Sequence, residues 1–191
     1  MNSAKKTIDI KKLTYLAILS AIVFLLQIIS FFMRGPVFSL TFVLVPIVIG
    51  VALCGFGAGP WLGFVFGVAV LVTGDANLFL SINAFGTIVT VILKGIFAGA
   101  AAAGVYKALV GINKYVAVVV AAITAPLVNT GTFFVGCLLF FNDYIASLAG
   151  DTNIALFIIT AFIGFNFLIE VAVNMILVPT VYRLINIKRK V

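Results

Sequence analysis

The sequence predicts an all-α integral membrane protein, a compact bundle of six transmembrane helices with both termini in the cytoplasm. Of its 191 residues 64% are hydrophobic and the mean hydropathy is +1.35, whereas a soluble domain is only about half apolar. Polar interruptions divide the chain into apolar segments, most of them near the ~20 residues that a helix needs to cross a bilayer. The cations gather at the ends of these segments, where membrane topology explains them.

The predicted spans set the domain organisation. They are 13–33, 37–54, 60–73, 84–106, 115–141 and 154–182. The third is short, so we expect it to be tilted, to extend into the next loop, or to be covered by its neighbours. A basic N-terminal segment (1–12) precedes the transmembrane domain (13–183), and a basic tail (184–191) follows it. The first apolar run is too long for a signal peptide and lacks a small-x-small cleavage site, so we interpret it as a retained helix.

The charges predict the orientation of the bundle. A cytoplasmic N-terminus places every cation inside except Arg34, which is external, and Lys94, which lies within the membrane, in agreement with the positive-inside rule. Asp75, Asp143 and Asp151 then fall in external loops. Topology thus explains the net charge of +7, and nucleic-acid binding is not expected. The expected location is the cell membrane, as a multi-pass protein of a bacterial plasma membrane.

The first span carries a patch of small residues. Ala17 and Ala21 lie one helical turn apart with Ser20 beside them, and small residues allow close approach of another membrane helix. Two interpretations are open, internal packing and a docking face for a second membrane protein.

Glycines recur at helical spacing in the third and fourth spans. Gly59, Gly63 and Gly67 form a doubled GxxxG, and Gly95 and Gly99 repeat it. This pattern predicts close helix packing. The glycine-rich turn before Pro60 lacks the preceding strand and the following Lys-Ser/Thr of a phosphate-binding loop.

Polar residues form a stripe on the fourth span. Asn83, Thr87, Thr90 and Lys94 are spaced i, i+4, i+7 and i+11, which places them on one helical face running from the outer surface toward the middle. The threonines could instead bond to the preceding turn of their own helix. Four polar side chains that end at a lysine favour a functional face.

The last span places one carboxylate between two amides. Asn166, Glu170 and Asn174 are spaced i, i+4 and i+8 on one helical face. A charge at bilayer depth costs a few kcal/mol, so Glu170 should face the protein interior. Its natural partner is Lys94. Whether the two form a structural ion pair or line a binding cavity stays open.

Together the polar residues predict a pocket for one small polar molecule, open to the outside. Its candidate residues are Asn83, Thr87, Thr90, Lys94, Asn129, Asn166, Glu170 and Asn174, with Arg34 and Asp75 as external-loop candidates. Histidine is absent and the two cysteines are isolated, so no metal site, disulfide or usual general base is expected. We expect no cofactor and no catalytic activity.

Several short motifs resemble one family across the whole chain. They are the Ala17-xxx-Ala21 patch, Phe38-Ser39-Leu40-Thr41 with Pro46, Asn83-Ala-Phe-Gly86-Thr87, Leu93-Lys94-Gly95, Ala98-Gly99 and Asn129-Thr130. In these the chain resembles the substrate-binding S components of energy-coupling factor (ECF) vitamin transporters. The resemblance implies a six-helix binding subunit whose alanine patch docks on a T component driven by two cytoplasmic ATPases, and which topples to carry its vitamin inward. The lack of histidine departs from the nickel and cobalt branch of the family.

The identity of the vitamin is open. Lys94 and Arg34 favour a carboxylate, as in pantothenate or folate, whereas riboflavin would favour aromatic walls, and Trp61 is assigned near the cytoplasmic side. We prefer a pantothenate-like compound. The expected partners are this vitamin, membrane lipid, the T component and the two ATPases. Alternatives are a secondary transporter, although no inverted repeat is evident, a membrane-embedded enzyme, or an assembly subunit without a ligand.

Overall fold

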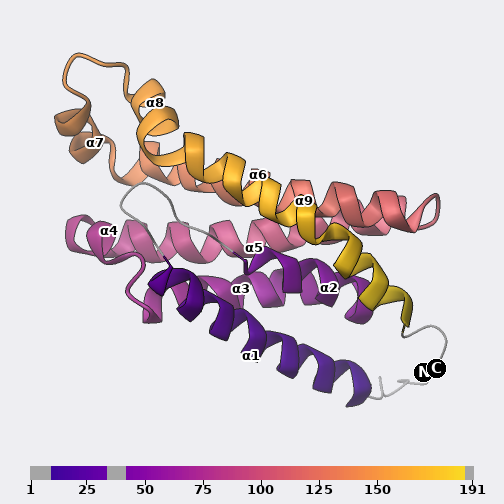
Figure 1. Cartoon of the computed structure of the whole chain (residues 1–191). Helices are drawn as coiled ribbons and strands as arrows, with labels where there is room; N and C mark the ends of the chain where they lie inside the picture. The colour runs from indigo at the N-terminus through magenta and orange to yellow at the C-terminus, as the bar shows by residue number, and fades with distance from the viewer. Residues whose placement is uncertain (1–9, 34–41, 188–191) are drawn as a thin grey trace, which may run out of the picture.

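The computed structural model describes residues 10–33 and 42–187, without the side chains at 162, 165, 166 and 187. The described residues form helices joined by short turns, and the long helices run side by side (Figure 1). The elements in order are α1 Ile10–Phe32, α2 Leu44–Cys54, α3 Ala58–Val72, α4 Asn77–Ile82, α5 Ala84–Leu109, α6 Lys114–Phe140, α7 Asn142–Ala149, α8 Ile154–Phe157, the π-helix η1 Ile158–Ile163 and α9 Gly164–Ile187.

The helix lengths agree with an all-helical membrane protein. In the described part of the chain, four helices, α1, α5, α6 and α9, are long and apolar enough to cross a membrane. Helix α7 and the helical stretch Ile154–Ala161, which covers α8 and the start of η1, form a pair bent by 84°. The apolar helices α2 and α3 are shorter, with 11 and 15 residues. We assign the six spans to α1, α2, α3, α5, α6 and the continuous run from α8 through η1 to α9.

The second span is shorter than predicted. The prediction began it at residue 37, but Phe42 and Val43 are not helical and α2 starts at Leu44; the stretch 34–41 lies outside the described residues. Pro46 explains the start, because proline fits the first turn of a helix, where its missing N–H needs no partner. Gly55 ends the helix with a φ of 93°, a conformation that glycine adopts without strain.

The external loops and the last span also differ from the prediction. Short helices α4 and α7 form within segments predicted as loops, and the last helix extends to Ile187 rather than to residue 182. The six residues of η1 widen the helix within the last span. Such a π-helical turn does not alter the spacing of apolar residues enough to be predicted from hydropathy.

The centre of the bundle is α5, which packs against α3 on one side and α6 on the other. A Cβ atom added at Gly59 would overlap the carbonyl of Gly99, and one added at Gly63 would overlap the carbonyl of Gly95. At Gly67 it would lie 2.9 Å from the Val91 carbonyl oxygen. The close packing predicted from these glycines is confirmed.

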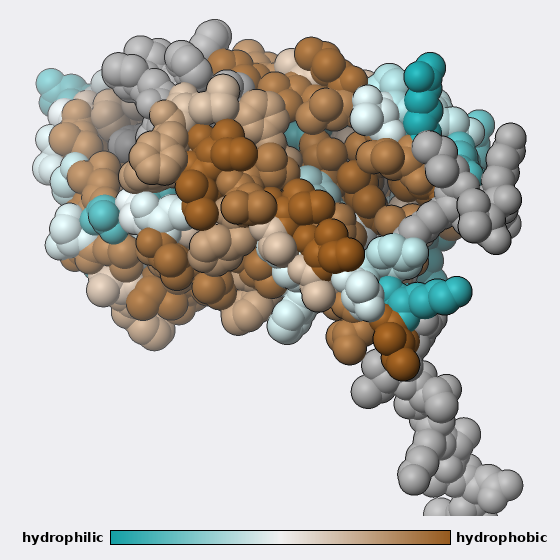
Figure 2. All heavy atoms as spheres, turned by 60° about the horizontal axis from the view of Figure 1, so that its bottom comes forward, coloured by the Kyte–Doolittle hydropathy of each residue, from teal (hydrophilic) through white to brown (hydrophobic). Residues whose placement is uncertain are grey.

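Charge separates the two ends of the bundle. The start of α1, the α5–α6 turn and the end of α9 lie at one end (Figure 1), and carry Lys11, Lys107, Lys114 and Arg183. The α3–α4 turn and α7 lie at the other end and carry acids. Figure 2 shows hydrophobic surface over most of the middle and hydrophilic residues mainly toward the ends. This distribution matches an orientation with the basic end in the cytoplasm.

Candidate functional site

The outer end of the polar stripe begins at Asn83, which caps α5. Its side chain accepts a hydrogen bond from the Gly86 backbone N–H at 2.9 Å and donates one to the Phe140 carbonyl at 3.3 Å. Asparagine is a favoured cap because its side chain satisfies an N–H that the helix leaves unbonded. Asn83 thereby also ties the start of α5 to the end of α6, and its predicted contact with a ligand stays a prediction.

The two threonines of the stripe differ in how their hydroxyls are satisfied. Thr87 is buried, and its hydroxyl donates to the Asn83 carbonyl at 2.8 Å, as the alternative interpretation expected. Thr90 is also buried, against Gly136 of α6, but its Oγ1 has no hydrogen-bond partner among the described residues. A buried hydroxyl left unbonded costs about 1–3 kcal/mol, so Thr90 is the better candidate for a ligand contact.

Lys94 follows Thr90 by one turn and is half-buried between aromatic rings. Its Nζ lies 5.8 Å from the ring centroid of Phe66 on α3 and 5.5 Å from that of Phe133 on α6. Aromatic faces attract cations by about 0.5–2 kcal/mol at such distances. The two rings therefore help a lysine to stay charged at bilayer depth. Nothing in the spacing of the nineteen phenylalanines distinguished Phe66 and Phe133 as neighbours of Lys94.

Asn129 lies on the face of α6 that carries Phe133, because the two residues are one turn apart. It is buried, and its Oδ1 has no hydrogen-bond partner in the described part of the chain. Its amide oxygen adds a polar group to the same face of α6 as Phe133, the ring that lies beside Lys94. The structure thus brings Thr90, Lys94 and Asn129 to the α5–α6 interface.

Two of the predicted site residues on α9 are also buried. Glu170 is 7% and Asn174 1% exposed, and the Asn174 Nδ2 donates to the Glu170 carbonyl at 2.8 Å. The Asn174 Oδ1 has no hydrogen-bond partner among the residues that the structure describes. Helix α9 packs on α6 and α2. The side chain of Asn166 lies outside the description, and pairing of Lys94 with Glu170 stays a prediction.

At the external end, Asp75 contacts a residue that sequence analysis missed. The Nε2 of Gln27 on α1 donates to the Asp75 Oδ2 at 3.1 Å. Gln27 and Ser30 are both buried, and the Ser30 Oγ has no partner among the described residues. Their spacing of i and i+3 in an otherwise apolar helix was a usable signal for an inward polar face. Arg34, the other loop candidate, lies outside the described residues.

The small-residue patch of α1 is divided between surface and interior. Ala17 and Ala21 are exposed. Ser20 is half-buried; its hydroxyl accepts from the Trp61 Nε1–H at 3.1 Å and donates to the Leu16 carbonyl at 2.7 Å. Ser20 therefore contributes to the contact between α1 and α3. The two exposed alanines beside it form a surface of small side chains.

In the described residues, no three His, Cys, Asp or Glu side chains come together in a way that could hold a metal ion. The polar groups at the α5–α6 interface can donate and accept hydrogen bonds and can neutralise an anion. This chemistry suits binding of a small polar molecule.

The family comparison covers nearly the whole chain. Residues 11–182 match the family model described as "ECF transporter, substrate-specific component". Comparisons with curated proteins and with solved structures gave no match.

Proposed function

The chain belongs to the ECF transporter substrate-specific component family, and on this premise we propose that it binds a small carboxylate-bearing vitamin of the pantothenate type. Members of this family are non-catalytic, membrane-embedded substrate-binding subunits that work with a T component and ATPases. This membership decides against an embedded enzyme, a self-sufficient secondary transporter and an assembly subunit without a ligand.

The observation that carries the proposed substrate class is the position of Lys94. Its ammonium group lies in the bundle between two aromatic rings, where a positive charge attracts an anion more strongly than in water because the surroundings screen it less. Thr90 and Asn129 lie on the two helices that meet beside it, each with a buried oxygen that lacks a partner among the described residues. A ligand with a carboxylate and several hydroxyl or amide groups would complement all three.

The outer half of the bundle is the proposed place of entry. The polar stripe begins at the external end with Asn83 and stops at Lys94, and the part of α5 beyond Lys94 is mostly glycine and alanine packed against its neighbours. Glu170 and Asn174 of α9 extend the proposed site, as does Asn166. Folate and riboflavin remain alternative vitamins for the same position.

The test is ligand identification on the isolated protein. Mass spectrometry of compounds that copurify with the detergent-solubilised chain should find a pantothenate-like carboxylate, and calorimetry should show that pantothenate binds without nucleotide, since the ATPases are separate chains. Asn129→Ala should weaken binding about ten- to hundredfold, because removal of one contact leaves the partner unbonded. Binding of folate or riboflavin in its place would refute the proposed vitamin but not the binding role.

We further propose that Ala17 and Ala21, with Ser20 beside them, form the docking surface for the T component. Exposure of both alanines on α1 supports this, because small side chains permit close helix contact. Ala17→Trp is expected to abolish vitamin uptake by the complete transporter while pantothenate binding by the isolated chain stays unchanged.

Ala172→Trp is a matched control, because Ala172 is likewise exposed, on α9; uptake by this variant should persist. Uptake assays in cells and calorimetry on purified protein give the two readouts. Loss of pantothenate binding in Ala17→Trp would identify the patch as internal packing instead.

A further inference from the structure

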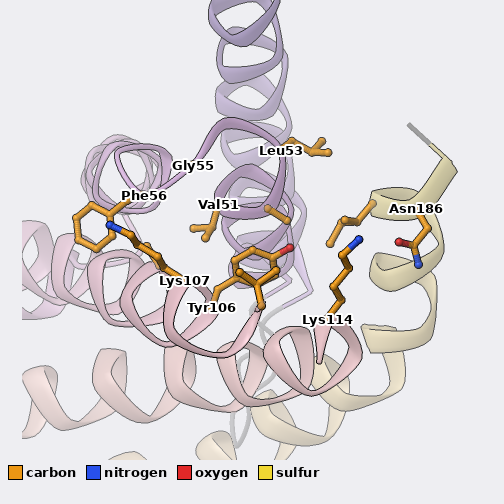
Figure 3. A pocket seen from close by; sticks show the side chains of 12 residues that line it. Val51, Leu53, Gly55, Phe56, Tyr106, Lys107, Lys114 and Asn186 are labelled. Atoms are coloured by element: carbon orange, nitrogen blue, oxygen red, sulfur yellow. The ribbon is translucent and has the colours of Figure 1, made fainter. Parts of the chain in front are cut away.

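A hollow of about 660 Å³ opens at the basic end of the bundle, away from the polar α5–α6 interface. It lies between the end of α2, the α5–α6 turn and the end of α9 (Figure 3). None of the residues that line it is among the candidate site residues predicted from the sequence. Its volume is comparable to that of small-molecule pockets, which are about 300–1,000 Å³.

Two lysines stand at the hollow. Lys107 comes from the last turn of α5 and Lys114 from the first turn of α6, and Figure 3 shows them on either side of the buried Tyr106, with Asn186 on the side of Lys114. Lys107 is exposed and Lys114 half-buried. None of the described residues that line the hollow is acidic, so its charge is positive.

The remaining walls are largely apolar. Phe56, Val51, Leu53, Val110 and Ile185 supply them. A free, fully hydrated anion would gain no favourable contact from apolar walls. A phospholipid has both a charged headgroup and an acyl chain that can contact them. The combination of two cations and an apolar lining therefore matches an amphiphilic anion.

The position in the membrane agrees with this chemistry. The cytoplasmic end of a bundle lies at the level of the inner-leaflet headgroups, and basic pockets between transmembrane helices on that side can bind anionic lipid headgroups. Isolated lysines at helix ends would only mark topology. Here the turn between α5 and α6 holds both lysines at one hollow.

We propose that this hollow binds an anionic phospholipid of the inner leaflet, with its phosphate between Lys107 and Lys114 and an acyl chain along the apolar wall. Asn186 supplies a neutral amide for the headgroup. The proposal is independent of the vitamin site, because none of the proposed vitamin-binding residues lines the hollow.

The test compares phosphatidylglycerol with phosphatidylcholine on the delipidated full chain in detergent. Native mass spectrometry gives the affinity of each lipid, and thermal unfolding gives the stabilisation. Near a membrane each lysine contributes about 1 kcal/mol toward an anionic lipid, which predicts a loss of phosphatidylglycerol affinity of about fivefold for Lys107→Gln or Lys114→Gln and about thirtyfold for the double variant. Phosphatidylcholine affinity should not change.

Two controls separate this site from general electrostatics and from a free-anion site. The double variant Lys11→Gln, Lys12→Gln removes the same charge from the exposed start of α1, at the same end of the bundle but outside the lining of the hollow. Because exposed lysines that do not touch the phosphate contribute little, phosphatidylglycerol affinity should stay within about twofold of the wild type. Inorganic phosphate should neither stabilise the chain nor displace the lipid. An equal loss in the control, no loss in the Lys107 and Lys114 variants, or stabilisation by phosphate alone that matches phosphatidylglycerol would each overturn the proposal.

Discussion

Gly63→Ala is expected to destabilise the bundle by about 1–3 kcal/mol or more, the usual range for inserting a methyl group into a packed interior. Its new Cβ would overlap the Gly95 carbonyl across the α3–α5 contact. The overlap is with backbone, so no side-chain rotation relieves it and the helices must separate. Each kcal/mol corresponds to about 2–4 °C in Tm for a chain of this size, so a loss of several degrees is expected.

Thermal unfolding in detergent, followed by the fluorescence of Trp61, the single tryptophan, measures this change. Gly104→Ala is the matched control, because Gly104 lies on the partner helix α5 and an added Cβ meets nothing within 4 Å. Alanine there should be neutral or slightly stabilising, since it favours the helix more than glycine does. Equal Tm values for the two variants would show that the α3–α5 contact is looser than the structure indicates.

The same contact explains why the short helix α3 can form part of a membrane bundle. Its 15 residues are fewer than a full span needs, but Gly59, Gly63 and Gly67 bring its backbone against α5 along its length. In lipid no hydrophobic effect drives helices together, so dispersion contacts between closely packed backbones stabilise their association instead. The sequence of this short span is compatible with three explanations, and coverage by neighbouring helices is the one that these contacts support.

Most of the fold could be predicted because hydropathy and charge act over whole helices. Composition predicted the membrane class, and the glycine spacing predicted the α3–α5 contact. The start of α2 was predicted wrongly because the hydropathy of the apolar residues before Pro46 is the same whether their backbone is helical or extended. The helix α4 and the π-helical turn depend on local hydrogen bonds that do not change the average polarity of a segment.

The candidate site was only partly predictable, for a related reason. Helical spacing predicted a shared face for Asn83, Thr87, Thr90 and Lys94. It does not show which hydroxyl or amide group finds a hydrogen-bond partner in the folded protein. The structure shows this difference between Thr87, bonded to its own helix, and Thr90, which has no partner among the described residues. Contacts between residues far apart in sequence, such as Gln27 with Asp75, were likewise not predictable from helical spacing.

Lys94→Met is expected to have the largest effect on ligand binding. Removing one partner of a buried charge pair costs about 2–5 kcal/mol, so loss of the ammonium group should weaken pantothenate binding roughly thirty- to several-thousandfold, more than the loss of a neutral contact in Asn129→Ala. Methionine keeps much of the apolar stem between Phe66 and Phe133, so the fold should persist. Lys107→Met is the control: it removes a lysine from the same helix at the cytoplasmic end and should leave calorimetric affinity unchanged.

A structural ion pair between Lys94 and Glu170 predicts a different result, which a double-mutant cycle can measure. If the two groups pair, Lys94→Met and Glu170→Gln alone each strand a buried charge and cost several kcal/mol of stability, while the double variant costs less than their sum. If Lys94 serves the ligand, the stability changes add and only the affinity for pantothenate falls. Strongly non-additive Tm values with unchanged affinity in Lys94→Met would therefore remove Lys94 from the binding site, and with it the preference for a carboxylate.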